Sequence, residues 1–199
     1  MFSIIAKGGI IMVPILICSI ISVTVIVERI LFWLGHSRKP HTPGALLAIA
    51  KTSGPGEMAK EAGRVNHPVA RVLAAGASSR RESAGAAMES QAMDEAAGMN
   101  KFLPALDTII TLAPLLGLLG TIIGMIRSFD VISLSGLGTP HAVTGGVAEA
   151  LIATAAGLVV AILTLIPYNY FHAKAEKTTE EMERYATRLE LVLKERERL

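Results

Sequence analysis

Three long apolar runs alternate with polar segments along this chain. The apolar runs cover residues 9–34, 102–128 and 147–171. Each is long enough to cross a hydrocarbon layer of ~30 Å, which takes about 20 helical residues. A single helix satisfies all of its own backbone hydrogen bonds in lipid, so these runs are expected to be helices. The pattern predicts an all-α membrane protein with three transmembrane helices.

The polar segments also carry helical signals. Residues 43–52 form a short predicted helix that ends at SGPG, and the Ala-rich stretch 82–100 is expected to continue as a helix into the second span. In the tail, apolar residues recur at helical spacing at Met182, Tyr185, Leu189, Val192 and Leu193. Spans two and three are therefore expected to extend into a helical domain. The apolar face of the tail is expected to pack on the chain's own loop helices or on a neighbouring subunit.

Basic residues give the expected orientation. Of the 19 Lys and Arg residues, 16 lie in 36–101 and 172–199. The positive-inside rule places both segments in the cytoplasm and the amino terminus outside. The predicted order is an outer terminus 1–8, transmembrane helix 9–34, cytoplasmic helical loop 35–101, transmembrane helix 102–128, outer connection 129–146, transmembrane helix 147–171 and cytoplasmic helix 172–199. The first run is read as a retained anchor, because no small-residue cleavage site follows it.

Spans two and three each sort small and hydroxylated residues onto one face. At about 100° per residue, span two aligns Thr111, Pro114, Gly117, Thr121 and Gly124, and span three aligns Thr154, Gly157, Ala161 and Thr164. Thr121 and Thr154 are expected at one depth, and Thr111 and Thr164 at a second. Two interpretations are open: close packing of helices, or a wet path lined by hydroxyls.

Composition excludes several classes of function. The chain is 51% hydrophobic and 18% charged, and its net charge of +2 is too small to argue for a nucleic-acid partner. One cysteine and no histidine pair at ligand spacing predict no metal site, and no phosphate-binding loop is present. No serine protease arrangement is recognisable. We expect no enzyme activity and no cofactor.

The positions of the carboxylates in the spans bear on whether the chain can carry protons. Glu28 and Asp107 lie near the inner ends of their spans, and Glu149 lies near the outer end of span three. None is at the membrane centre, where a proton relay would need one. Either the chain conducts nothing, or another chain supplies the acid. For Glu149, stabilisation by the free amides of a helix amino terminus is an alternative to a role in conduction.

Two segments of the chain resemble a known family of membrane proteins. APLLGLLGTIIGMIRSF in span two and GGVAEALIATAAGLVVAILTLIPYNYF in span three resemble the MotA/TolQ/ExbB family of proton channels, specifically its three-span ExbB and TolQ branch. NHPVARVLAAGA in the loop fits the same branch. The resemblance implies that Thr121 and Thr154 face a pore and that Glu149 lies at its outer mouth. Tyr168 and Asn169 match the family's Tyr-Asn pair.

The resemblance also implies partners. Five copies of the chain would form a ring around two transmembrane helices of an ExbD-like or TolR-like protein whose aspartate titrates, in a bacterial inner membrane, with a TonB-like protein as a further partner. We favour an ExbB-like subunit that uses the proton motive force to drive outer-membrane transport. A TolQ-like role in envelope integrity and constriction, a non-conducting membrane scaffold, and Na⁺ in place of H⁺ stay open as alternatives.

Overall fold

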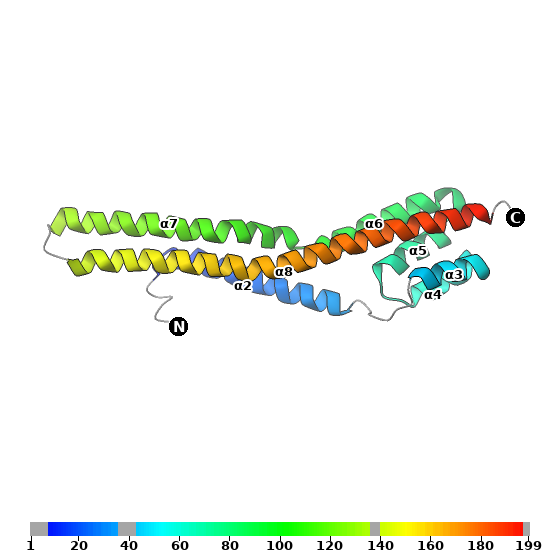
Figure 1. Cartoon of the computed structure of the whole chain (residues 1–199), viewed down its shortest axis with the longest axis horizontal. Helices are drawn as coiled ribbons and strands as arrows, with labels where there is room; N and C mark the ends of the chain where they lie inside the picture. The colour runs from blue at the N-terminus through cyan, green and yellow to red at the C-terminus, as the bar shows by residue number, and fades with distance from the viewer. Residues whose placement is uncertain (1–7, 36–42, 136–139, 197–199) are drawn as a thin grey trace. The chain divides into compact units, whose positions relative to one another are not determined.

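A computed structural model describes residues 8–35, 43–135 and 140–196 (Figure 1). Within these ranges the chain is helical, with no strand. The helices are α2 (Met12–Gly35), α3 (Pro43–Thr52), α4 (Pro55–Gly63), α5 (Pro68–Ser78), a 3₁₀ turn (Arg81–Ser83), α6 (Ala84–Asn100), α7 (Leu103–Ser135) and α8 (Pro140–Glu195). Most of the predicted outer terminus 1–8 and part of the outer connection lie outside the described residues.

Three stretches of helix are long and apolar enough to cross a membrane, and they lie in α2, in α7 and in the first part of α8. The predicted all-α membrane fold with three spans is confirmed, and so is the continuation of the last span into a long helix. The helix expected over 43–52 is present as α3, whereas α4 was not predicted. The Gly-Pro-Gly sequence before α4 looks like a helix end, yet Pro55 occupies the first turn, where its missing N–H costs nothing.

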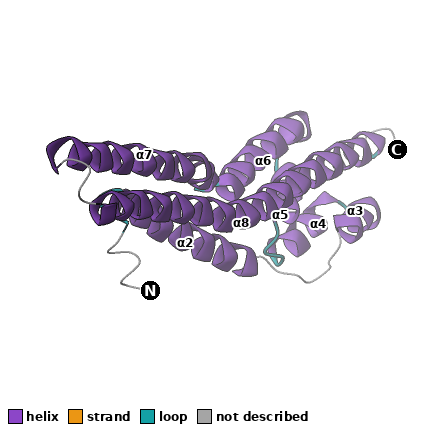
Figure 2. Cartoon of the chain, turned by 60° about the vertical axis from the view of Figure 1, so that its left-hand side comes forward, coloured by secondary structure: helices purple, strands orange, loops and turns teal. Residues whose placement is uncertain are grey.

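The described residues form helices joined by short loops (Figure 2), and the chain divides into two compact units. The first, here called the span unit, comprises Met1–Glu28 and Phe102–Tyr170. The second, the polar unit, comprises Arg29–Lys101 and Phe171–Leu199. Because α2 and α8 each cross the division, both helices contribute to both units. The two units are described separately below.

In the span unit, small residues let α7 and α8 approach backbone to backbone. A methyl group added at Gly117 would meet the Thr154 Cα at 2.9 Å, and one added at Gly157 would meet the Ala113 carbonyl. The side chains between the two helices are small as well, since Ala113 and Ala153 are fully buried. α2 completes this core with Cys18, which clusters with Ile109 and Ala113. Backbone contact of this kind is typical of membrane helices.

The outward faces of the same helices carry large apolar side chains. Ile20 on α2, Phe129 on α7 and Ile166 on α8 are each about two-thirds exposed. In water such a surface would aggregate, whereas in a bilayer it meets lipid or a neighbouring helix. The contact between α7 and α8 is thus made of small residues, whereas the outward faces of the span unit are bulky and apolar.

The polar unit has a conventional core of larger side chains. Leu46, Met58, Leu73, Met88 and Met182 are almost completely buried. The tail of α8 buries Leu189, Val192 and Leu193 as well. Its apolar face therefore packs on the chain's own helices, which is one of the two predicted alternatives. α6 lies beside the end of α8, where the Glu190 carboxylate is against Gly85 (Figure 1).

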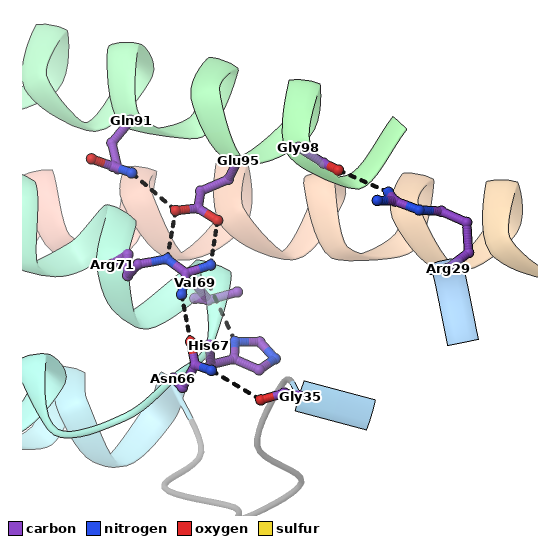
Figure 3. A network of polar contacts seen from close by, with 9 residues as sticks. All are labelled: Arg29, Gly35, Asn66, His67, Val69, Arg71, Gln91, Glu95 and Gly98. Atoms are coloured by element: carbon purple, nitrogen blue, oxygen red, sulfur yellow. Dashed lines mark hydrogen bonds and ion pairs between the residues drawn. The ribbon is translucent and has the colours of Figure 1, made fainter. Parts of the chain in front are cut away.

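A polar cluster holds the helices of this unit together (Figure 3). Arg71 on α5 makes a bidentate pair with Glu95 on α6, with Nε and Nη2 each 2.5 Å from a carboxylate oxygen. Its Nη1 donates to Asn66 Oδ1, and Asn66 in turn donates to the Gly35 carbonyl at the end of α2. Gln91 donates to the same Glu95 carboxylate. The cluster therefore joins three segments that are distant in sequence.

Arg29 fixes the end of α6. Its side chain is 1% exposed, and Nη1 donates to the carbonyls of Gly98 at 2.9 Å and Met99 at 3.2 Å. The last carbonyls of a helix have no partner within the helix, and a cation there also offsets the helix dipole. The guanidinium lies 4.5 Å from the ring centre of Phe32 as well. This arginine thus caps α6 from α2.

The expected continuous helix from residue 82 into span two is wrong at one point. α6 ends at Asn100, α7 begins at Leu103, and Phe102 between them has a φ of 66°. Pro104 explains the interruption: it has no N–H to donate to the Asn100 carbonyl, and its ring would clash with that carbonyl. The chain restarts with Pro104 in the first turn of α7, where proline is tolerated.

Candidate functional site

Two of the predicted site hydroxyls lie on neighbouring turns of the span unit. Thr154 on α8 donates from Oγ1 to the Gly117 carbonyl on α7 at 2.8 Å. Thr121, one turn further along α7, donates to its own Leu118 carbonyl at 2.6 Å. One turn of helix is ~5.4 Å, so the two threonines lie about one turn apart along α7, and not at one depth as expected. Both are partly exposed, which leaves their oxygen lone pairs accessible to water or a ligand.

The second predicted pair has different surroundings. Thr111 is exposed and donates to the Asp107 and Thr108 carbonyls of its own helix. Thr164 is 1% exposed and donates to Val160, and its oxygen shares a 2.6 Å hydrogen bond with Ser22 on α2. The Thr164 hydroxyl is therefore directed to the first span, inside the subunit.

The predicted stripe of small residues lies largely between α7 and α8. Besides Gly117 and Gly157, a methyl group added at Gly124 would meet the Ala150 Cβ at 2.7 Å. Ala161 is 7% exposed. Pro114 lies within α7, which continues through it although proline offers no N–H to the preceding turn. These positions bring two backbones of one chain together.

Glu149 does not share a face with the threonines. It precedes Thr154 by five residues, which turns its side chain by ~140° around α8. Its Oε1 lies 3.5 Å from Nη1 of Arg127 on α7, and the two side chains are 34% and 56% exposed. On its other side lies Gly9, which has a φ of 69° and leaves no room for a Cβ beside the carboxylate. The Glu149 carboxylate is thus held between α7 and the turn before α2.

The helix-terminus explanation for Glu149 is wrong. It required the carboxylate to lie among the free amides of the first turn. α8 begins at Pro140, nine residues earlier, and has no acidic residue in its first turn. The start of α8 at Pro140 was not predicted, because the segment before Val147 is rich in glycine and polar residues.

Sequence reasoning missed two partners in this unit. Neither Arg127 nor Ser22 is among the residues predicted for the site. A signal for Arg127 exists, because antiparallel spans bring the last turns of α7 beside the first turns of α8. For Ser22 the sequence gives no such signal, because Ser19 and Thr24 are hydroxyls in the same helix.

The middle of the spans carries no charged side chain. Residues 108–126 of α7 and 150–171 of α8 contain no Asp, Glu, Lys, Arg or His. Among the described residues, no three His, Cys, Asp or Glu side chains gather where they could hold a metal ion. The chemistry that the site offers on its own is therefore that of hydroxyls and backbone carbonyls.

Comparison with known proteins identifies relatives over most of the chain. A model of the MotA/TolQ/ExbB proton channel family matches residues 64–184. ExbB-like 3, a biopolymer transport protein of Synechocystis, is 38% identical over 174 residues, covering 83% of this chain and 82% of its own. ExbB-like 1 of the same organism is 34% identical and covers 95% and 77%. The Tol-Pal system protein TolQ of Pseudomonas aeruginosa is 45% identical over 74 residues, 37% of this chain and 32% of its own.

The family model spans more than half of the chain, including the two helices that carry the site. The match to ExbB-like 1 covers 95% of the chain. This multi-pass membrane protein belongs to the MotA/TolQ/ExbB proton channel family.

Proposed function

We propose that the chain is the channel subunit of a complex that uses the proton motive force, together with an ExbD-like partner, to drive transport across an outer membrane. Relatives that cover most of the chain bear the names of biopolymer transport proteins. The proposal includes a bacterial inner membrane location, with the amino terminus outside and the carboxyl terminus in the cytoplasm. The 16 basic residues in the two long polar segments support that orientation.

One observation carries the proposal. Thr121 and Thr154 lie on neighbouring turns, partly exposed, in helices that have no charged side chain in their central turns. Hydroxyls can solvate a proton carrier but cannot themselves bind and release protons near neutral pH. A partner's carboxylate, placed beside them, would supply that group, and hydrogen-bond donors around it would favour its ionised form. The chain and its partner would each be incomplete alone.

We further propose a ring of five copies, with α7 and α8 inside and α2 outside, closed around two partner helices. The glycines of α7 and α8 contribute little to this proposal, because Gly117, Gly124 and Gly157 are already used between helices of one chain. The support comes from the family and from the side of α7 that carries Thr111, Pro114 and Thr121. A TonB-like protein would connect the complex to the outer membrane.

Within this proposal, Glu149 acts at the outer mouth of the pore by concentrating cations. Its pairing with Arg127 adds a condition, because a paired carboxylate attracts a passing cation less strongly than a free one. Thr164 has a different part: its bond to Ser22 makes it a link between α8 and α2. We therefore leave Thr164 out of the proposed proton path and retain Thr111 at its inner end.

Two alternatives have specific support. A TolQ-like role in envelope integrity is favoured by the 45% identity to the Pseudomonas aeruginosa protein, although that match covers only 74 residues. A non-conducting scaffold is favoured by the backbone contacts of α7 and α8, because these explain the small residues without a pore.

The test is ion flux into proteoliposomes that contain the chain with an ExbD-like protein. Thr121→Val and Thr154→Val remove a hydroxyl and keep the side-chain shape, and each is expected to reduce proton flux at least tenfold. The matched control is Thr24→Val in α2, whose hydroxyl donates to the Ile20 carbonyl of its own helix. We expect that variant to conduct like the parent. A sodium gradient in place of the proton gradient identifies the ion.

Wild-type flux in the Thr121→Val, Thr154→Val double variant would assign these residues to packing and contradict their place in the path. If the parent protein itself conducts nothing with its partner, the scaffold is correct. Deletion of the gene distinguishes the two transport roles: an ExbB-like subunit is needed for energised uptake, and a TolQ-like subunit for envelope integrity.

A further inference from the structure

Asp107 is an exposed carboxylate near the start of the α7 span. It follows Leu103 by four residues, ~6 Å along the helix axis. Within the part of the chain that the structure describes, its side chain has neither an ion-pair partner nor a hydrogen-bond partner. The first turn of α7 contains no acidic residue, so the free amides of a helix terminus do not explain the position of Asp107.

A carboxylate at this depth is not expected to face lipid. A charged side chain inside a bilayer is costly, and those that occur face the interior of a bundle or a water-filled cavity. Lysine and arginine can reach the membrane surface with their long stems, whereas aspartate has a single methylene group. Asp107 therefore marks a side of α7 that meets water or protein.

The other polar residues of the helix indicate which side this is. Within residues 103–126, the polar side chains of α7 are those of Asp107, Thr108, Thr111 and Thr121. At about 100° per residue, Asp107, Thr111 and Thr121 fall within an arc of ~80°. The carboxylate thus shares one side of α7 with both hydroxyls that this helix contributes to the proposed proton path.

The opposite side of α7 is covered by α2. Leu116 packs against the cluster that contains Ile109 and, from α2, Cys18. Leu116 follows Asp107 by nine residues, so the two side chains are turned ~180° from each other. Asp107 therefore faces away from α2. Because α2 lies outside in the proposed ring, the side of α7 that carries Asp107 is directed to the pore.

Further hydrogen-bond acceptors follow Asp107 along this side. The Thr111 hydroxyl donates to the Asp107 and Thr108 carbonyls and keeps its own lone pairs. Pro114 has no N–H to donate to the Ile110 carbonyl, which leaves that backbone acceptor without its usual helical partner. Acceptors thus continue from Asp107 for about two turns toward the centre of the span.

We propose that Asp107 is the proton acceptor at the inner end of the path. The partner's carboxyl group loses its proton to water, the Asp107 carboxylate binds that proton, and cytoplasmic water then takes it. Each O–H bond that breaks is matched by one that forms, and the Asp107 carboxylate is regenerated. This inference rests on the proposed proton channel and adds the group through which the proton leaves it.

Proton flux into proteoliposomes tests this role, with the full chain and an ExbD-like protein. Asp107→Asn keeps the side-chain shape and removes the group that binds the proton, so flux should fall at least about tenfold. Asp107→Glu keeps a carboxylate on the same side of α7 and should retain more than about half of the parent flux. Native mass spectrometry checks that each variant assembles like the parent.

Thr108 provides matched controls at nearly the same depth. It is turned ~100° from Asp107, toward the side that carries the exposed Leu115, and its hydroxyl donates to the Pro104 carbonyl. Thr108→Val should conduct like the parent. The Asp107→Asn, Thr108→Asp double variant has the net charge of the parent but carries its carboxylate on the other side, so its flux should stay as low as that of Asp107→Asn.

Thiol labelling of the same complex in lipid nanodiscs is a second measurement, and it does not depend on flux. In a Cys18→Ala background, Asp107→Cys should react with a charged maleimide at least about tenfold faster than Thr108→Cys. The reason is that the reactive thiolate forms in water, which the first side chain faces and the second does not.

The outcomes separate this inference from the proposed function. A parent protein that conducts no protons with its partner contradicts the proposed function itself. A conducting parent whose flux is unchanged in Asp107→Asn, or is restored in the double variant, overturns the role of Asp107 alone. Labelling at Thr108→Cys that is as fast as at Asp107→Cys overturns it as well.

Discussion

The span unit and the polar unit solve the problem of helix packing in different ways. In the span unit, α7 and α8 touch through backbone atoms, as Gly157 and Ala113 illustrate. In the polar unit, helices are separated by large side chains, as where Met88 fills the space beside Gly76. One chain thus carries a contact between two helices made almost entirely of glycine and alanine, and a core made of methionine and leucine.

The difference reflects the solvent around each unit. Lipid is as apolar as leucine, so burying large side chains between membrane helices gains little, and dispersion contacts and hydrogen bonds between close backbones must supply the attraction. In water, each buried leucine or methionine side chain contributes roughly 1.5–3 kcal/mol. The two cores should therefore respond differently to the same kind of substitution.

The largest effect is expected from a side chain placed between α7 and α8. In Gly157→Val, the new Cβ would overlap the Ala113 carbonyl oxygen, so the two backbones must separate. We expect a loss of stability of about 3 kcal/mol, at the upper end for overpacked cores. The measurement is unfolding of the purified protein in mixed micelles with increasing denaturing detergent.

A glycine of the polar unit provides the comparison. Gly98 lies inside α6, and a methyl group there meets nothing within 4 Å. Gly98→Ala should therefore increase stability by about 0.5–1 kcal/mol, because alanine favours the helix. If the two substitutions lower stability equally, the contrast between the units is wrong.

A second, smaller effect is expected from the polar cluster. Glu95→Ala removes the carboxylate that receives both Arg71 and Gln91, and its side chain is only 12% exposed. Loss of a charged hydrogen-bonding partner there should cost about 2 kcal/mol. Glu57→Ala, which removes an exposed pair with Lys60, should change stability by less than about 0.5 kcal/mol.

The same unfolding measurement checks both variants, and the Arg71→Met, Glu95→Leu double variant sharpens the result. If the cost comes from leaving Arg71 partly buried without its partner, replacing both charges with apolar side chains should recover part of the loss. Equal losses in Glu95→Ala and Glu57→Ala would show that the cluster contributes no more than a surface ion pair.

Sequence patterns predicted the elements better than the partners of individual residues. The three spans follow from apolar length, and the buried face of the tail follows from the helical spacing of Met182 and Leu189. The break at Phe102 was missed although Pro104 signals it, because the alanines before it favour a helix so strongly. Arg29 could not be predicted as the cap of α6, since its acceptors are backbone carbonyls some 70 residues away.

The candidate site shows the same limit. Periodicity placed Thr164 on the face that carries Thr154, which is true of the helix, but the direction in which each hydroxyl bonds depends on the neighbouring helix. Thr154 meets α7 and Thr164 meets α2. A helical wheel shows which residues share one side of a helix, but it does not show which neighbouring helix packs against that side.

The smallest effect concerns that hydroxyl pair and shows how much a hydrogen bond contributes between spans. Thr164 already donates to Val160, so Ser22 is the donor in the bond that joins α2 and α8. Hydrogen bonds between membrane helices contribute ~0.6 kcal/mol on average, because the separated helices find other partners for the same groups. Ser22→Ala, Thr164→Val and the double variant form a cycle that isolates the coupling. We expect a coupling of about 0.6–1 kcal/mol, well below the cost of Gly157→Val. A coupling above about 2 kcal/mol would mean that hydroxyl bonding, and not close backbone packing, dominates the span unit.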